Sequence, residues 1–371
     1  MAYDLTKIPI QALLQPISEA TAALTRLDER LKQSPLGPGC LERLQFHDAC
    51  ASLWIDGELV HLEDLVLHDA SRDIRSPTHE LTIAHAVLRA RRKILRFSGG
   101  WALSPEGFAA LRGAESLLEN EDEEGRGNGV AMPLNPQIET EGNEVDPLAQ
   151  DLAALDAVLE RSTAILSGAP APQRETPKKR AEIVYDPEWG EEDRLAEWRE
   201  VLRKTESMPP ILRAVLLLDT WNSLDVLERT PWLGRLLAAS SLSEAGLTSA
   251  GHLATVNLGL KLIARDKRTS KNLETRLTAL LSALTAAAEF GLKEHDKLVL
   301  ARQTLEHRLK GRRKSSKLPE LVDLVLSRPM VSASMIAKDI GVTPQAALRL
   351  VEELNLRELT GRGRFRVWGI V

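Results

Sequence analysis

The sequence predicts a mainly α-helical protein with a small β element at its C-terminal end. Apolar residues recur at intervals of three and four over most of the 371 residues, which is the period of amphipathic helices. No long alternating pattern typical of strands occurs before residue 356, and no repeat of fixed period is present. Hydrophobic residues make up 43% and charged residues 27%, as is usual for a soluble globular protein.

The chain is expected to begin with a series of amphipathic helices. The first is interrupted near Pro16, because proline lacks the N–H that an interior helical position donates. The helix at 77–95 has Pro77 near its start and a basic last turn, and both features suit helix ends. The expected helices cover 10–32, 40–55, 59–70, 77–95, 101–113, 148–166 and segments of 191–286, with breaks at Pro209–Pro210 and Thr230–Pro231.

Composition divides the chain into four parts. Residues 1–113 form an N-terminal helical segment, and residues 114–147 form an acidic linker whose few large apolar residues predict disorder. Residues 148–292 form a helical core that contains a second linker, rich in proline and charge, at 168–182. Residues 293–371 form a basic helix followed by a C-terminal module.

Charge is distributed unevenly along the chain, whose formal net charge is −5. Residues 293–371 contain sixteen Lys and Arg against nine Asp and Glu, a net charge of +7, so the first 292 residues carry −12. A basic end on an acidic chain is typical of a confined module that binds a polyanion. A solvated basic face would be the better interpretation if no motif accompanied this charge.

Composition also excludes several classes of protein. No apolar run is long enough for a transmembrane helix, and the N-terminus lacks the pattern of a secretory signal. The two cysteines, Cys40 and Cys50, are too few for a disulfide framework or a four-cysteine zinc site, and we expect them to be small apolar side chains. A cytoplasmic protein is therefore expected.

Residues 329–371 have the spacing of a helix-turn-helix motif. Ser332 is a suitable N-cap for a helix that ends near Ile340, and Gly341 suits a turn with a left-handed backbone. Thr343 and Pro344 supply an N-cap and a first position for the next helix, which runs to about Leu354. The segment 318–326 would be the first helix of the module, and 356–370, with Gly361 and Gly363 in its middle, is expected to form a hairpin wing.

This module is predicted to bind double-stranded DNA. Its second helix would lie in the major groove, where Gln345 and Arg349 suit adenine and guanine, with Thr343 as a cap or a phosphate contact. The wing would contact phosphate or the minor groove, and residues 310–317 would add phosphate contacts. The alternative is a module that docks on protein, because the second helix is poor in basic residues. The wing residues expected to contact DNA are Arg362, Arg364 and Arg366.

Two further segments resemble parts of Fic-type proteins. Pro231–Trp232 is similar to the Pro-Phe step of the Fic loop, and the following Gly-Arg-Leu-Leu at 234–237 is similar to the start of the next Fic helix. Upstream, residues 51–58 are similar to the inhibitory Ser-x-x-x-Glu-Gly pattern, with Asp56 in place of the glutamate. The run Thr-Gly-Arg-Gly-Arg at 360–364 is similar to the winged helix that follows some Fic domains. The resemblance implies a multi-helix Fic-like body.

The sequence departs from the Fic pattern at the residues that carry out the reaction in Fic proteins. AMP transfer needs a histidine base and a glycine-rich phosphate cradle, but Thr230 stands at the histidine position and the cradle is missing. We therefore expect no enzyme activity and no cofactor, and we expect Arg235 to be an ordinary structural arginine rather than an anion ligand. The whole chain also resembles uncharacterised plasmid-borne proteins of plant-associated bacteria that pair a domain of unknown function with a helix-turn-helix.

Other candidate sites are weaker. A histidine cluster lies among carboxylates, but no two of its histidines have the four-residue spacing that places a pair on one helical face, so solvated or hydrogen-bonded histidines are favoured over a metal site. The tryptophans are expected to be core anchors. No small-molecule ligand and no membrane contact is inferred, and a homodimer is expected only because two-fold operators suit helix-turn-helix readers. The histidines are His61, His68, His79 and His85, and the tryptophans are Trp54, Trp101, Trp189, Trp198, Trp221, Trp232 and Trp368.

Overall fold

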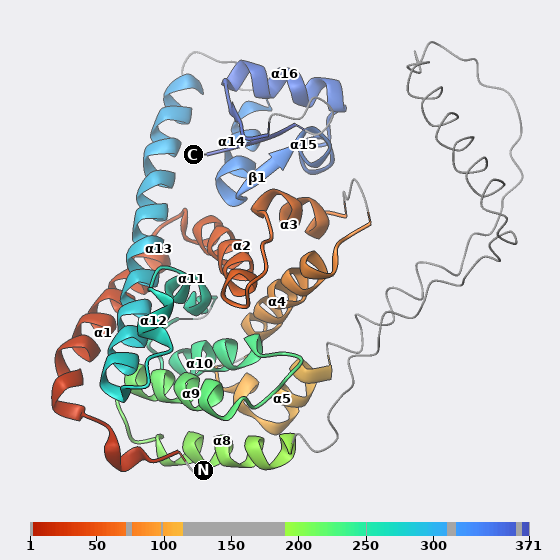
Figure 1. The fold of residues 1–371 in the computed structure, drawn as a ribbon. Coiled ribbons are helices and arrows are strands. Elements are labelled where there is room, and N and C mark those ends of the chain that lie inside the picture. Colours follow the sequence, from red (N-terminus) through yellow and green to blue (C-terminus); the bar gives the residue numbers. More distant parts are fainter. Residues whose placement is uncertain are drawn as a thin grey trace, which may run out of the picture. The chain divides into compact units, whose positions relative to one another are not determined.

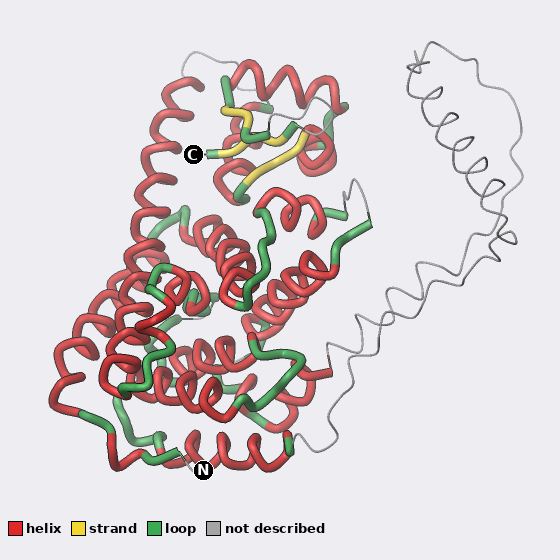
Figure 2. Tube along the Cα trace, in the orientation of Figure 1, coloured by secondary structure: helices red, strands yellow, loops and turns green. Residues whose placement is uncertain are grey.

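Helices dominate the structure, as the sequence predicts (Figures 1 and 2). The computed structural model describes residues 3–71, 76–97, 99–113, 190–249, 251–309, 317–360 and 366–370. The helix expected at 148–166 and the linkers expected at 114–147 and 168–182 lie outside the described residues. The helices of the body, by which we mean the described residues before 310, are α1 (Ile10–Gln33), α2 (Gly37–Ile55), α3 (Leu62–Asp69), α4 (His79–Leu95), α5 (Pro105–Arg112), α8 (Glu191–Lys204), α9 (Pro210–Leu224), α10 (Trp232–Glu244), α11 (Val256–Lys261), α12 (Arg265–Arg268) and α13 (Leu273–Leu309), with short 3₁₀ turns at Leu5–Lys7 and Trp101–Leu103.

The C-terminal module alternates helices with three short strands. In chain order it contains α14 (Leu318–Ser327), β1 (Met330–Ser332), α15 (Ala333–Ile340), α16 (Pro344–Leu354), β2 (Arg357–Glu358) and β3 (Val367–Gly369). The strands form an antiparallel sheet in the order β1-β3-β2, with Val331 opposite Trp368 and Glu358 opposite Trp368. The expected hairpin of β2 and β3 is therefore confirmed, whereas β1 was not expected.

The prediction that the first helix breaks near Pro16 is wrong. α1 continues through this proline, which removes only one backbone hydrogen bond. Leu13 and Ala20, on either side, are completely buried, and α1 packs along α13. Tertiary packing of the surrounding turns thus outweighs the local cost of the proline. The breaks expected at Pro209–Pro210 and Thr230–Pro231 are confirmed, since α9 and α10 begin there.

α13 is a single helix of 37 residues. It passes without interruption through residues 292 and 293, where composition placed a border between the helical core and the basic C-terminal part. Its N-terminal portion packs against α1 and α11, and it also contacts α14 of the C-terminal module. α13 therefore extends from the body to the C-terminal module (Figure 1).

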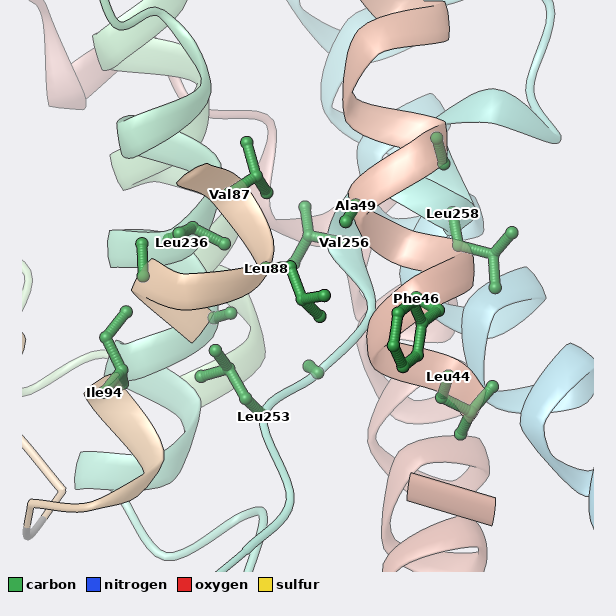
Figure 3. Close-up of a cluster of buried hydrophobic side chains, with 14 of the residues drawn as sticks. Leu44, Phe46, Ala49, Val87, Leu88, Ile94, Leu236, Leu253, Val256 and Leu258 are labelled. Carbon is green, nitrogen blue, oxygen red and sulfur yellow. The ribbon is translucent and has the colours of Figure 1, made fainter. Parts of the chain in front are cut away.

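The core of the body is formed by leucine, valine and alanine side chains from helices far apart in the sequence. Figure 3 shows Leu44 and Phe46 of α2 facing Leu258 of α11, with Leu88 of α4 and Leu253 nearby. All five side chains are at most 6% exposed. α2 meets α4, α11, α13 and α14, so it joins elements that are far apart in the sequence.

A buried ion pair crosses this core. Arg91 of α4 donates to Asp48 of α2 at 2.6 Å, and both side chains are fully buried. Asp48 also accepts from the side-chain amide of Asn257 (2.7 Å) and the backbone N–H of Leu258 (2.9 Å), while Arg91 donates to the carbonyl of Leu253 (2.8 Å). A buried charge is tolerated only with such partners, so this network fixes α2, α4 and α11 in one arrangement.

Most of the expected tryptophan anchors are in the core, but one is not. Trp198, Trp221, Trp232 and Trp368 are buried, Trp101 is half-buried, and Trp189 lies outside the described residues. The prediction for Trp54 is wrong, because its side chain is 41% exposed in the last turn of α2. There the ammonium group of Lys261 lies 5.7 Å from the centre of the indole ring, a cation–π contact rather than core packing.

Candidate nucleic-acid interface

The turn between α15 and α16 is determined by local capping contacts. Ser332 Oγ accepts the N–H of Met335 at the start of α15 (3.3 Å). Gly341 then has a φ of 71°, a left-handed conformation that glycine adopts without a steric penalty. The N–H of Val342 returns to the carbonyl of Ala337 (3.0 Å) and closes the end of α15. The helix-turn-helix predicted at these residues is present.

The next helix, α16, presents two polar side chains on its exposed face. Thr343 Oγ1 accepts the N–H of Ala346 (3.2 Å), and Pro344 occupies the first helical position. Gln345 and Arg349, four residues apart and therefore on one face, are exposed. Neither has a hydrogen-bond or ion-pair partner among the described residues. The opposite face of α16 is buried through Ala347, Val351 and Leu354.

The wing holds one of the three predicted arginines in an ion pair. Across the hairpin, Arg366 Nε donates to Glu358 Oε2 at 2.8 Å, and its guanidinium lies 5.3 Å from the centre of the Trp368 ring. Trp368 is buried and packs the hairpin on its helices, as expected. Arg362 and Arg364 lie outside the described residues. The structure thus places Thr343, Gln345, Arg349 and Arg366 in one module, but Arg366 is already partnered.

Two arginines that the sequence did not single out hold the module in place. Arg308, near the end of α13, donates to the carbonyls of Leu354 (2.7 Å) and Asn355 (3.0 Å), which are orphan acceptors at the C-terminus of α16. Asn355 has a φ of 50° and ends the helix. Because Arg308 and Leu354 are 46 residues apart, no local pattern could have identified this contact.

The second arginine, Arg43 of α2, is buried and donates to the carbonyl of Val325 in α14 at 2.9 Å. Its other partner is Glu294 of α13 (3.5 Å), and burial lowers the pKa of the Arg43 guanidinium. One turn earlier, a Cβ on Gly39 would lie 2.6 Å from the carbonyl oxygen of Leu326. The glycine therefore allows α2 and α14 to approach closely enough for the arginine contact.

The two segments that resemble Fic proteins meet in the body. Arg235 of α10 donates to both carboxylate oxygens of Asp56 (2.9 and 2.6 Å) and to Ser52 Oγ (2.9 Å). Arg235 is only 4% exposed. The arginine therefore has the structural role that was expected of it, with its two terminal nitrogens occupied by Ser52 of α2 and by Asp56, which follows the end of that helix.

The histidine cluster forms hydrogen bonds and a ring contact. The rings of His68 and His85 meet edge to face, with centroids 4.6 Å apart, and His85 Nε2 lies 3.3 Å from Asp69. Asp69 also accepts from Arg92 (3.1 Å). Among the described residues, no group of three or more His, Cys, Asp or Glu side chains is arranged to hold a metal ion.

The two cysteines are reduced and largely withdrawn from water. Cys40 is buried and Cys50 is half-buried. Burial raises the pKa of each thiol to about 12, so the reactive thiolate is disfavoured in both. Both are therefore suited to packing, as the sequence suggested. None of the described helices is both long and apolar enough to cross a bilayer.

Comparison with known proteins also separates the body from the C-terminal module. Residues 183–310 match a family described as a protein of unknown function, DUF1612, and residues 318–371 match a helix-turn-helix DNA-binding domain. The chain is 54% identical over 380 residues to the uncharacterized protein y4cF of Sinorhizobium fredii, and the match covers all of both chains. The chain therefore belongs to the family of y4cF, and in it a DUF1612 region precedes a helix-turn-helix DNA-binding domain.

Proposed function

We propose that this protein is a cytoplasmic transcriptional regulator that reads duplex DNA with α16. The observation that carries the proposal is the exposed, unpartnered pair of Gln345 and Arg349 on the face of α16 opposite its buried side. In the major groove, arginine pairs with the O6 and N7 acceptors of guanine, and glutamine with the N6 and N7 of adenine. The capped N-terminus of α16 directs both side chains toward the groove floor.

Thr343 is assigned a phosphate contact. Its Oγ1 already accepts the N–H of Ala346, which leaves the hydroxyl hydrogen available for a phosphate oxygen. Such contacts from a helix N-terminus fix the register of a protein on DNA without carrying sequence information.

The wing arginines are assigned unequal roles. Because Arg366 is paired with Glu358 and packed over Trp368, it serves mainly to hold the hairpin on the sheet. Arg362 and Arg364 are assigned the contacts with phosphate or the minor groove. A partnered cation neutralises less phosphate charge than a free one, so removing Arg366 should change the salt dependence of binding less than removing the other two.

The body is proposed to be a Fic-derived scaffold without catalytic activity that serves for dimerisation or for sensing a partner. Support comes from the contact of Arg235 with Asp56 and Ser52, which joins the two segments that resemble Fic proteins at the pattern's own serine and acidic positions. Thr230 in place of a histidine leaves no base to activate a hydroxyl group. We accordingly propose no nucleotidyl transfer.

A protein-docking adaptor is the second candidate. It is favoured by Glu352 and Glu353, two exposed acidic residues in the last turns of α16, and by the net charge of −5. Carboxylates repel phosphate, so a helix that enters the groove over its full length would not carry them. In the DNA-binding model only the N-terminal half of α16 faces the bases.

Fluorescence anisotropy with duplexes from around the protein's own gene, and with duplexes selected from random sequence, tests the proposal. Arg349→Ala should cost about 1–3 kcal/mol of binding free energy and relax base choice at one position. Lys32→Ala, in an exposed position of α1, is the control and should leave base choice unchanged. Absence of DNA binding at low salt, together with one stoichiometric protein partner on purification, would favour the adaptor.

A further inference from the structure

A second basic surface lies outside the helix-turn-helix domain. Residues 261–271 contain five Lys and Arg and one acidic residue, Asp266, although the first 292 residues together carry a charge of −12. Four of the five cations are exposed and Arg268 is half-buried. We call this set the α12 patch; it consists of Lys261, Arg265, Lys267, Arg268 and Lys271.

The α12 patch is held in a defined conformation. The carbonyl of Ser270 accepts from Arg276 of α13 at 2.7 Å, and Arg276 is itself anchored on the buried Asp219 (3.0 Å). The side chain of Asn272 caps α13 by accepting the N–H of Thr275 (2.9 Å). The cations of the patch therefore lie on a segment whose backbone is held by hydrogen bonds.

The cations of the α12 patch lack acidic partners. Several surface cations elsewhere are paired, for example Arg30 with Asp296 and Arg302 with Glu306. In the part of the chain that the structure describes, none of the five patch residues forms an ion pair with a carboxylate. Arg268 Nε is buried without a hydrogen-bond partner, and burial together with the nearby Arg265 and Arg235 lowers the pKa of Arg268. Arg265 and Arg268 thus repel each other without a carboxylate partner among the described residues, whereas Lys261 contacts the ring of Trp54.

The distribution of these charges suits an extended polyanion. Cations at 261, 265 and 268 and at 267 and 271 spread over eleven residues of surface, whereas a single small anion would need convergent donors. Duplex DNA presents one phosphate charge per about 1.7 Å of helix axis, which many separate cations can contact together. We propose that the α12 patch is a second contact surface for the phosphate backbone of duplex DNA, used together with the helix-turn-helix. This inference rests on the proposed DNA-binding function.

The test uses the full chain and two duplexes that share the selected binding sequence. One ends at the sequence read by α16, and the other is extended on both sides. Binding is measured by anisotropy over a sodium chloride series for the wild type, for Arg265→Gln/Lys267→Gln/Arg268→Gln, and for a control of equal charge change, Arg26→Gln/Lys32→Gln/Arg203→Gln, at exposed sites elsewhere. Urea unfolding verifies that each variant is folded, and Lys267→Glu provides a single exposed change.

On the extended duplex the patch variant should lower the magnitude of the salt slope by about 0.9 per lost phosphate contact, hence by up to about 2.7. The short duplex should show no such change, and the control variant should match the wild type on both. Equal slopes for the patch and control variants on the extended duplex overturn this inference alone. A wild type that binds no duplex overturns the proposed function as well. Patch-dependent binding to phosphatidylserine vesicles, without an effect on DNA, would assign the surface to a membrane instead.

Discussion

The helical body and the C-terminal module each contain an ion pair, and the two pairs differ in burial. In the body, Asp48 and Arg91 are fully buried and bonded to each other. In the module, the pair of Glu358 and Arg366 keeps 31% and 44% of its side-chain surface exposed. A buried pair holds helices in a single arrangement because an unpartnered charge there is costly, whereas an exposed pair can exchange its partner for water or phosphate. These two pairs therefore differ in how firmly each one fixes the elements that it joins.

The largest difference in stability is expected between a variant that removes the buried Arg91 and one that removes the exposed Arg366. Arg91→Ala should destabilise the protein by about 3–5 kcal/mol, because it leaves the Asp48 carboxylate buried without its ionic partner. Arg366→Ala should cost about 0.2–1 kcal/mol, because both partners of its pair remain in contact with water. Urea unfolding followed by circular dichroism measures both values.

The control for this comparison is the double variant Asp48→Asn/Arg91→Ala. If Arg91→Ala destabilises the protein because it leaves the Asp48 carboxylate buried without a partner, removing the charge of Asp48 should recover part of the lost stability. Equal destabilisation by Arg91→Ala and Arg366→Ala would contradict the contrast between the two regions.

The module could be predicted from the sequence almost completely because its signals are local. Ser332, Gly341 and Thr343 act on backbone groups within five residues of themselves, so their residue types alone indicate where α15 and α16 begin and end. Only β1 was missed. It is three residues long and exists through its pairing with β3, near the other end of the module, and this pairing leaves no period in the sequence.

The body could be predicted only as a set of helices. Its defining contacts join residues that are far apart, such as Arg91 with Leu253 and Arg43 with Val325, which are separated by 162 and 282 positions. Hydrophobic periodicity gives the face of a helix that is buried but not the helix that covers it. The same limit hid Arg308 as a support for α16, and it left Trp54 assigned to the core.

An intermediate loss of stability is expected when either of two glycines with the same backbone conformation is replaced. Gly341 in the module and Gly246 in the body have φ values of 71° and 72°, and a Cβ on either would meet no atom within 4 Å. Replacing each with alanine should therefore cost a similar amount, about 1–2 kcal/mol, from the left-handed conformation alone. Differential scanning calorimetry measures this cost.

DNA binding should separate the two glycine variants. Gly341→Ala alters the turn that sets α16 against α15 and should weaken binding, whereas Gly246→Ala, after α10, should leave binding unchanged. An equal loss of DNA affinity in both variants would show that the orientation of α16 depends on global stability rather than on this turn.

A pH-dependent effect is expected at Asp69, whose partly exposed ion pairs lie between these two pairs in burial. Burial raises the pKa of Asp69, but hydrogen bonds from His85 and Arg92 and their charges outweigh it and lower the pKa to about 2. Because this is below the unfolded value of about 3.9, the carboxylate stabilises the fold above about pH 4, and the contribution is lost as the pH falls toward about 2.

The stability difference between the wild type and Asp69→Asn should therefore be about 1 kcal/mol at pH 5, since water screens the pair, and should shrink as the pH approaches 2. Urea unfolding of both proteins across this range measures it. Arg92→Gln should weaken the same pH dependence, because it removes one of the two partners that lower the pKa of Asp69. A difference that stays constant from pH 5 to pH 2 would mean that Asp69 contributes through packing, and that the ion pair adds nothing to the way α3 and α4 are held together.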